Sequence, residues 1–174
     1  MLLSVALAVA DRRWLYRGGA LGRYDGRTFQ VIRVIDGDTL DVDVPDAHAP
    51  RGPSATTRVR LWGIDTPEVA KPDFNEPGEP FADAAADFTR NLCAGRHVTL
   101  HLESHRLRGR FGRVLAFVTL SDGTMLNERL LAAGLATADD RFSHRHFDRF
   151  ALIEQQARHE KLGLWAHGSA GAAK

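Results

Sequence analysis

Residues 58–68 read Arg-Val-Arg-Leu-Trp-Gly-Ile-Asp-Thr-Pro-Glu, an apolar run that ends in two acids on either side of a proline. Residues 61–64 are apolar at every position, which is typical of a strand buried on both faces. Pro67 fixes its own φ and favours an extended Thr66, so the chain should leave the strand in a defined direction. Acids at the tip of a buried strand cost stability unless a cation, either Arg60 or a metal ion, neutralises them. A simple polar turn explains these residues equally well.

A second acidic turn, Asp36-Gly37-Asp38, lies between two strand-like runs at residues 28–35 and 39–44. The second run alternates between apolar and acidic residues: Leu40, Asp41, Val42, Asp43 and Val44. This alternation predicts one face toward the core and one toward water. Asp38 shares the parity of the apolar positions and should therefore point inward. An Asp-Gly pair between strands is usually only a hairpin turn, but an inward acid needs a partner.

Three blocks of the chain together resemble the signature of the staphylococcal nuclease family. They are Val-Ile-Asp-Gly-Asp-Thr at residues 34–39, Arg-Leu-Trp-Gly-Ile-Asp-Thr-Pro-Glu at 60–68 and Phe-Gly-Arg at 111–113. The blocks occur in the family's order, and the resemblance extends over about residues 27–166. It implies an α+β fold: a five-stranded OB-fold β-barrel with three packed helices.

The hydrophobic pattern predicts the remaining elements. We expect irregular segments at 45–55 and 70–80, strands at 97–102 and 114–120, and helices at 81–94, 125–133 and 147–161. Within the first helix, the expected apolar stripe is Phe81, Ala85, Phe88 and Leu92. Cys93, the single cysteine, should be a packed thiol rather than a nucleophile.

The chain of 174 residues fits one domain, with a net charge of +1 that gives no global attraction to nucleic acid. We divide it into a lead-in at 1–26, a nuclease-like domain at 27–166 and a flexible tail at 167–174. Residues 1–10 are too short to span a membrane, for which about 20 apolar residues are needed. They resemble the remnant of an export or anchor segment, so we expect a secreted or exported monomer, with a cytoplasmic protein as the alternative.

The resemblance implies a calcium site. Asp38 and Asp65 supply carboxylate oxygens, the backbone carbonyl of Thr66 supplies another, and waters complete the set that Ca²⁺ prefers. No His or Cys lies in these blocks, so zinc has little support. Asp36 is expected to support Asp38 and the metal's waters rather than bind the ion.

The same resemblance assigns three catalytic residues. Glu68 would orient or deprotonate the attacking water, and Arg60 and Arg113 would grip the phosphate with their forked guanidinium groups. Taken alone, Arg60 is more simply an ion-pair partner of an acid, and Arg113 a solvated strand residue.

A basic run precedes Arg113 and is interpreted as a phosphate-facing patch: His105, Arg106, Arg108 and Arg110. Within it we assign Arg108, Arg110 and Phe111 to nucleic-acid binding. Phe111 stands where the family tends to have a tyrosine, so only its ring is left for packing or base stacking. Residues 138–141, Ala-Asp-Asp-Arg, replace the family's aromatic near the base. Residues 144–146, His-Arg-His, are expected to be surface charge.

These observations favour a Ca²⁺-dependent endonuclease that hydrolyses DNA and RNA, prefers single strands and, by resemblance, leaves 3′-phosphate ends. Few base-reading groups are evident, which favours single strands. The alternatives are a non-catalytic OB module that binds nucleic acid or protein, and a structural domain stabilised by a metal. Such modules typically lose the acids and arginines, so retention of all five, Asp38, Asp65, Glu68, Arg60 and Arg113, favours the enzyme.

Overall fold

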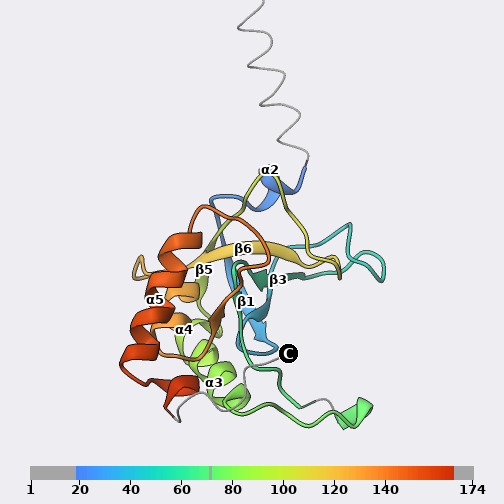
Figure 1. Cartoon of the computed structure of the whole chain (residues 1–174). Coiled ribbons are helices and arrows are strands. Elements are labelled where there is room, and N and C mark those ends of the chain that lie inside the picture. The colour runs from blue at the N-terminus through green and yellow to red at the C-terminus, as the bar shows by residue number, and fades with distance from the viewer. Residues whose placement is uncertain (1–18, 71, 167–174) are drawn as a thin grey trace, which may run out of the picture.

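The computed structural model describes residues 19–70 and 72–166 (Figure 1). Its strands are β1 (Arg27–Val34), β2 (Thr39–Val42), β3 (Thr57–Leu61), β4 (Ile64–Asp65), β5 (His97–His101), β6 (Val114–Thr119) and β7 (Thr137–Ala138). Its helices are α2 (Ala20–Tyr24), α3 (Ala82–Cys93), α4 (Leu126–Ala132) and α5 (Phe147–His159), with 3₁₀ turns η1 (Pro72–Phe74) and η2 (Gly163–Trp165).

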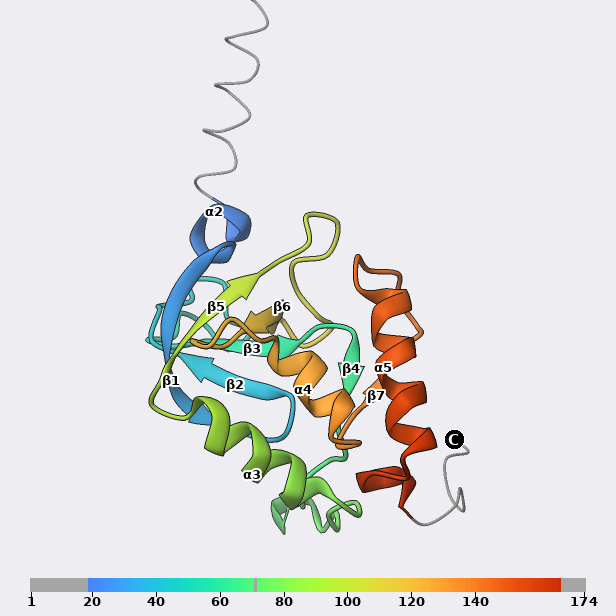
Figure 2. The same cartoon turned by 90° about the vertical axis from the view of Figure 1, so that its left-hand side faces the viewer.

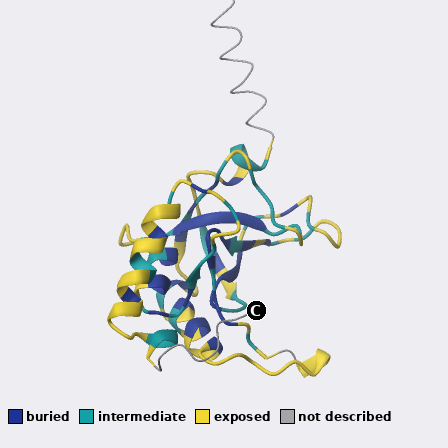
Figure 3. Ribbon diagram, viewed as in Figure 1, coloured by how far each residue is buried: buried dark blue, intermediate teal, exposed yellow. Residues whose placement is uncertain are grey.

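A closed barrel in the order β1-β2-β3-β6-β5 forms the centre of the molecule. β3 and β6 run parallel, the other neighbours run antiparallel, and β5 closes the barrel by pairing with β1. Alternate side chains fill the interior, where Leu40, Val59 and Phe117 are fully buried. The ribbon of β6 is coloured as buried along most of its length in Figure 3. The predicted α+β fold, an OB-fold barrel with packed helices, is confirmed.

The three longer helices pack on and beside the barrel (Figure 2). α3 contacts β1 and α4, whereas α4 packs against β6 and α5. The buried stripe of α3 differs from the one predicted: Ala82, Ala85, Ala86, Thr89 and Cys93. Phe81 instead precedes the helix with a left-handed φ of 68° and is exposed. The packed thiol is confirmed, because Cys93 is fully buried and burial raises its pKa to about 12.

The apolar run at residues 61–64 is not one strand, which corrects the sequence-based prediction. β3 ends at Leu61, and Gly63 turns the chain with a φ of +79° before β4 begins at Ile64. β4 then leaves the barrel and pairs with β7. The turn therefore carries Asp65 away from the barrel wall toward the C-terminal part of the chain.

Several smaller predictions were also wrong. Asp41, expected to face water, is 2% exposed. His144, expected on the surface, is 7% exposed and packs among the rings of Trp62, Phe117 and Phe150. The segment at 70–80, expected to be irregular, contains the 3₁₀ turn η1, and the lead-in contains the short helix α2. The predictions for residues 1–10 and 167–174 lie outside the described residues. In the part of the chain that the structure describes, no helix has the length and apolar character needed to cross a membrane.

Replacement of Gly63 should lower the free energy of unfolding more than replacement of a glycine that has open space around it. A Cβ there would overlap the imidazole of His144, in addition to the strain of the positive φ. Gly123 is the matched control, because it has a φ of +81° and open space around it. Gly63→Ala should lower the free energy of unfolding by about 2–5 kcal/mol, and Gly123→Ala by only about 1–2 kcal/mol. Urea unfolding measures both losses. Equal losses would show that the His144 imidazole can move away from the new Cβ without loss of stability.

Candidate active site

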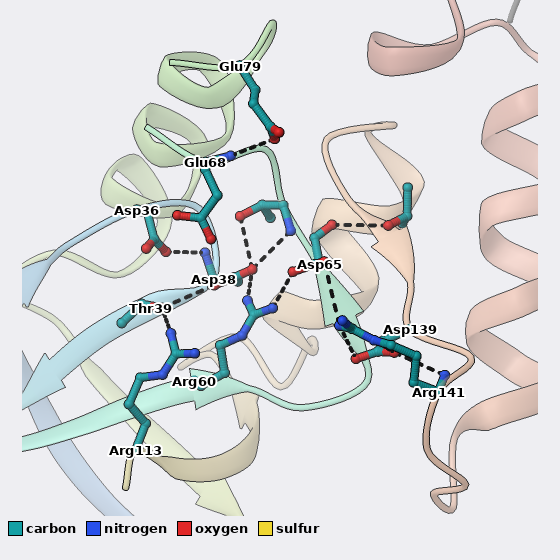
Figure 4. Close-up of polar contacts among 12 residues, drawn as sticks. Asp36, Asp38, Thr39, Arg60, Asp65, Glu68, Glu79, Arg113, Asp139 and Arg141 are labelled. Carbon is teal, nitrogen blue, oxygen red and sulfur yellow. Dashed lines mark hydrogen bonds and ion pairs between the residues drawn. The ribbon is translucent and has the colours of Figure 1, made fainter. Parts of the chain in front are cut away.

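Asp38 is the hub of a polar cluster at the start of β2 (Figure 4). Its side chain is 5% exposed, which confirms the predicted inward orientation. Its Oδ2 accepts hydrogen bonds from the backbone N–H of Thr66 at 2.9 Å and from the Thr66 hydroxyl at 3.0 Å. The Thr39 hydroxyl donates to Oδ1 at 3.1 Å. Gly37 allows this close approach, since a Cβ there would lie 2.7 Å from the Thr66 hydroxyl oxygen.

Arg60 joins the two acids that the sequence singled out. From β3 its Nη1 forms an ion pair with Asp38, and its Nη2 forms one with Asp65. The guanidinium is 13% exposed; burial lowers its pKa, and the negative charge of Asp65 opposes that shift. Asp38, Arg60 and Asp65 together carry a net negative charge. One cation thus already bridges both acids.

Asp65 owes its position to the small sheet of β4 and β7. Asp65 pairs with Thr137 across this sheet, and the Thr137 hydroxyl donates to the Asp65 carbonyl at 3.4 Å. The chain after β7 brings Asp139 and Arg141 beside the acid. Arg141 holds Asp139 through two hydrogen bonds of 2.7 and 2.8 Å, and its Nη2 lies 3.6 Å from Asp65 Oδ2. Sequence reasoning saw residues 139–141 only as a departure from the family pattern and missed this arginine.

Glu68 and Asp36 lie on the α3 side of Asp38. Glu68 is exposed, and its side chain points toward Asp36 and Asp38 in Figure 4. Glu79 fixes its backbone, because Glu68 N–H donates to Glu79 Oε2 at 3.0 Å and Glu79 N–H donates back to the Glu68 carbonyl at 2.9 Å. Asp36 Oδ1 accepts from the backbone N–H of Asp38 at 3.0 Å. Burial raises the pKa of Asp36, and the charge of Glu68 adds to the rise.

Arg113 approaches the same cluster from the segment before β6. Its Nη1 donates to the Thr39 hydroxyl at 3.1 Å, and that hydroxyl in turn donates to Asp38. The positive charge of Arg113 also contributes to lowering the pKa of Arg60, so the two guanidinium groups are near neighbours. Within the described residues, the buried Nε of Arg113 has no hydrogen-bond partner. Two adjacent arginines therefore flank the acids, as a phosphate site requires.

The predicted basic patch is only partly open to a ligand. Arg108, assigned to nucleic-acid binding, instead forms two 2.8 Å hydrogen bonds with buried Asp46 and one of 2.6 Å with the Gly112 carbonyl. Arg106 stacks on the Phe142 ring, with its guanidinium carbon 3.8 Å from the ring centre. These two arginines are therefore engaged in contacts within the protein. Arg110 and Phe111 are exposed, Phe111 to 64%, so they remain available for the predicted contacts.

The cluster is suited to an anionic substrate and a weakly held cation. Across residues 19–70 and 72–166, no three side chains of the His, Cys, Asp or Glu type converge as a metal-binding group. An ion at this site would rest on the carboxylates of Asp38 and Asp65, with a backbone carbonyl and waters. The hard oxygens fit calcium or a similar divalent ion and do not resemble a zinc site.

The OB-fold barrel with acids and arginines gathered at the end of β2 and β3 defines a phosphodiester hydrolase, and comparison with known proteins supports this class. A family model described as "Staphylococcal nuclease homologue" matches residues 58–167. The chain belongs to the staphylococcal nuclease family, and it is a nuclease.

Three relatives illustrate the similarity. The chain is 33% identical to the thermonuclease of Staphylococcus hyicus over 153 residues, which are 87% of this chain and 83% of the relative. It is 33% identical to the thermonuclease of Staphylococcus intermedius over 95% of this chain and 94% of the relative. Endonuclease YncB of Bacillus subtilis (strain 168) is 33% identical over 77% of this chain and 59% of the relative. These names support endonuclease activity.

Proposed function

We propose that this nuclease is a Ca²⁺-dependent endonuclease that cleaves DNA and RNA, prefers single strands and leaves 3′-phosphate ends. The observation that carries the proposal is that Asp38 and Asp65 both reach the guanidinium of Arg60. The two carboxylates therefore already lie around one cationic group. The non-catalytic module and the metal-stabilised structural domain have no comparable support, because neither explains two arginines beside the acids.

The metal would be held by Asp38, Asp65 and the Thr66 carbonyl. When bound, a divalent ion supplies positive charge for the phosphate and lowers the pKa of water. The two hydrogen bonds from Thr66 to Asp38 Oδ2 fix the position of the carboxylate. Asp36 holds the preceding turn by accepting from the Asp38 N–H. With two carboxylates and otherwise neutral ligands, affinity should be on the order of 10⁻⁴–10⁻³ M.

The remaining side chains would have separate roles in hydrolysis. Glu68 is exposed beside Asp36 and Asp38, where its carboxylate would accept a proton from the attacking water. Arg60 and Arg113 would donate hydrogen bonds to the phosphate oxygens, on which negative charge accumulates as water attacks. Their burial makes these contacts stronger than equivalent contacts in water. Exposed Phe111 and Arg110 would contact the neighbouring nucleotide.

Cleavage should depend on calcium and on strand form. We expect the chain to cut single-stranded DNA and RNA in millimolar Ca²⁺, to lose activity in excess chelator, and to cut a rigid G·C duplex more slowly than a single strand. Gel analysis of end-labelled substrates at matched salt measures the rates, and phosphatase sensitivity of the new ends identifies 3′-phosphates. Equal cleavage with Ca²⁺ and with chelator would refute the calcium requirement, and equal rates on duplex and single strand would refute the preference.

A further inference from the structure

A second pair of arginines is organised around a buried acid next to the active site. Asp41 in β2 lies opposite Arg33 in β1 and opposite Arg58 in β3. Its side chain is only 3% exposed, whereas those of Arg33 and Arg58 are 62% and 46% exposed. Arg33 donates through Nε and Nη2 at 3.2 and 2.7 Å, and Arg58 through the same two nitrogens at 2.8 and 3.1 Å. The buried acid thus fixes two solvent-facing guanidinium groups.

The pair lies on the same face of the barrel as Arg60 and Thr39. Arg58 is two residues before Arg60 in β3, and Asp41 is two residues after Thr39 in β2. Residues two apart in a strand point to the same side and are about 6.6 Å apart. Arg60 and Thr39 are cross-strand partners, and Thr39 binds Arg113. Arg58 and Arg60 therefore follow each other along one face, and their backbone spacing is comparable to that of neighbouring phosphates in an extended strand.

Both guanidinium groups keep donors for a ligand. Each has five N–H groups and uses two nitrogens on Asp41, so three N–H groups remain on each. In the described part of the chain, neither arginine has another hydrogen-bond or ion-pair partner. Burial raises the pKa of Asp41, but the hydrogen bonds from Arg58 and Arg33 outweigh it and the pKa is lowered. The trio therefore keeps a net charge of +1.

We propose that Arg33 and Arg58 form a subsite for a phosphate of the substrate strand next to the one that is cleaved. The inference rests on the proposed function only in taking a nucleic-acid strand as the ligand. The Asp41 carboxylate is neutralised by one guanidinium, so the second leaves the trio with a positive charge. Because Asp41 holds both forks in place, little side-chain freedom is lost when a phosphate binds. The subsite would make the enzyme favour chains over single nucleotides.

The test compares ligands with and without a neighbouring phosphate. Arg33→Gln, Arg58→Gln and the double variant are made in the full chain. Binding of a fluorescent deoxythymidine decamer is followed by anisotropy in chelator, where no cleavage is expected, and binding of a dinucleoside monophosphate is measured in competition. Arg149→Gln is the matched control, because Arg149 is 64% exposed and is paired with Glu128 between α5 and α4. Urea unfolding verifies that each variant is folded.

The double variant should bind the decamer roughly tenfold more weakly, and the slope of log affinity against log salt should fall by about 0.7, the value for loss of one phosphate contact. Binding of the dinucleoside monophosphate should not change. Arg33→Lys/Arg58→Lys should retain most of the salt slope, because charge is kept while the fork is lost. Decamer binding with an unchanged affinity and salt slope in the double variant would overturn the subsite. So would an equal loss for both ligands, since that would show an indirect effect through β2 and β3.

The outcome is separable from the proposed activity. A parent chain that binds the decamer through Arg33 and Arg58 but cleaves nothing in Ca²⁺ would support the subsite and refute the calcium-dependent endonuclease. If the parent chain cleaves in Ca²⁺ but binds the decamer equally well without Arg33 and Arg58, the result would support the calcium-dependent endonuclease and refute the subsite.

Discussion

Asp38→Ala should reduce cleavage by about 10³-fold or more, because it removes a proposed metal ligand and such an ion is worth several kcal/mol in the transition state. The same change should destabilise the fold by about 2–4 kcal/mol. Relief of repulsion between the two acids would by itself leave the fold intact. The structure instead shows Asp38 accepting bonds from Thr66 and Thr39 and pairing with Arg60, and all of these partners would lose their acceptor.

Steady-state cleavage in saturating Ca²⁺, calorimetric Ca²⁺ titration and urea unfolding measure the three consequences of Asp38→Ala. Asp43→Ala is the control, because exposed Asp43 also accepts a backbone hydrogen bond, from Gln30 at 2.7 Å, but lies outside the cluster. It should leave cleavage and Ca²⁺ binding unchanged. Unaltered Ca²⁺ binding in Asp38→Ala would exclude Asp38 from the metal site.

Arg60→Lys and Arg113→Lys should each lower kcat by about 10²–10³-fold with a much smaller effect on KM. Both guanidinium groups are proposed to stabilise the negative charge that accumulates on the phosphate oxygens in the transition state. A lysine is a point charge and cannot contact two oxygens as a fork does. The effect on stability should differ, because Arg60 bridges Asp38 and Asp65 whereas Arg113 donates to the Thr39 hydroxyl. Arg60→Lys should therefore be the less stable variant.

Single-turnover and steady-state kinetics at saturating Ca²⁺ separate chemistry from binding in these variants. Arg149→Lys serves as the control, since its pair with Glu128 lies on α5 and α4. A near-normal kcat in Arg60→Lys or Arg113→Lys would reassign that arginine to substrate docking or to an ordinary ion pair.

Strand periodicity was sufficient to predict the orientation of Asp38. Alternation from Leu40 onward fixed the parity of the strand, and any residue of that parity had to face inward. The same rule failed to predict the burial of Asp41. Arg33 and Arg58 on neighbouring strands neutralise this acid, and their side chains shield it from water. Periodicity within one strand contains no information about partners on other strands.

The turn at Gly63 and the position of Arg141 could not be read from local sequence for a related reason. A glycine inside an apolar run does not reveal whether its φ is positive, and here +79° ends one strand and starts another. Arg141 reaches Asp65 only because β4 pairs with β7, more than 70 residues further along the chain. Likewise, the burial of His144 depends on rings contributed by β6 and α5.

The pairing of β4 with β7 also sets the order in which the site can be completed during synthesis. Asp38, Arg60, Asp65 and Arg113 all leave the ribosome before Thr137 and Ala138, the residues that anchor Asp65. The backbone N–H of Ala138 in turn donates to Glu154 of α5 at 3.3 Å. A nascent chain therefore carries its acids and arginines without the strand that aligns them. The active site of a nuclease proposed to cut RNA would in this way stay incomplete while the chain is still attached to the ribosome, which itself contains RNA.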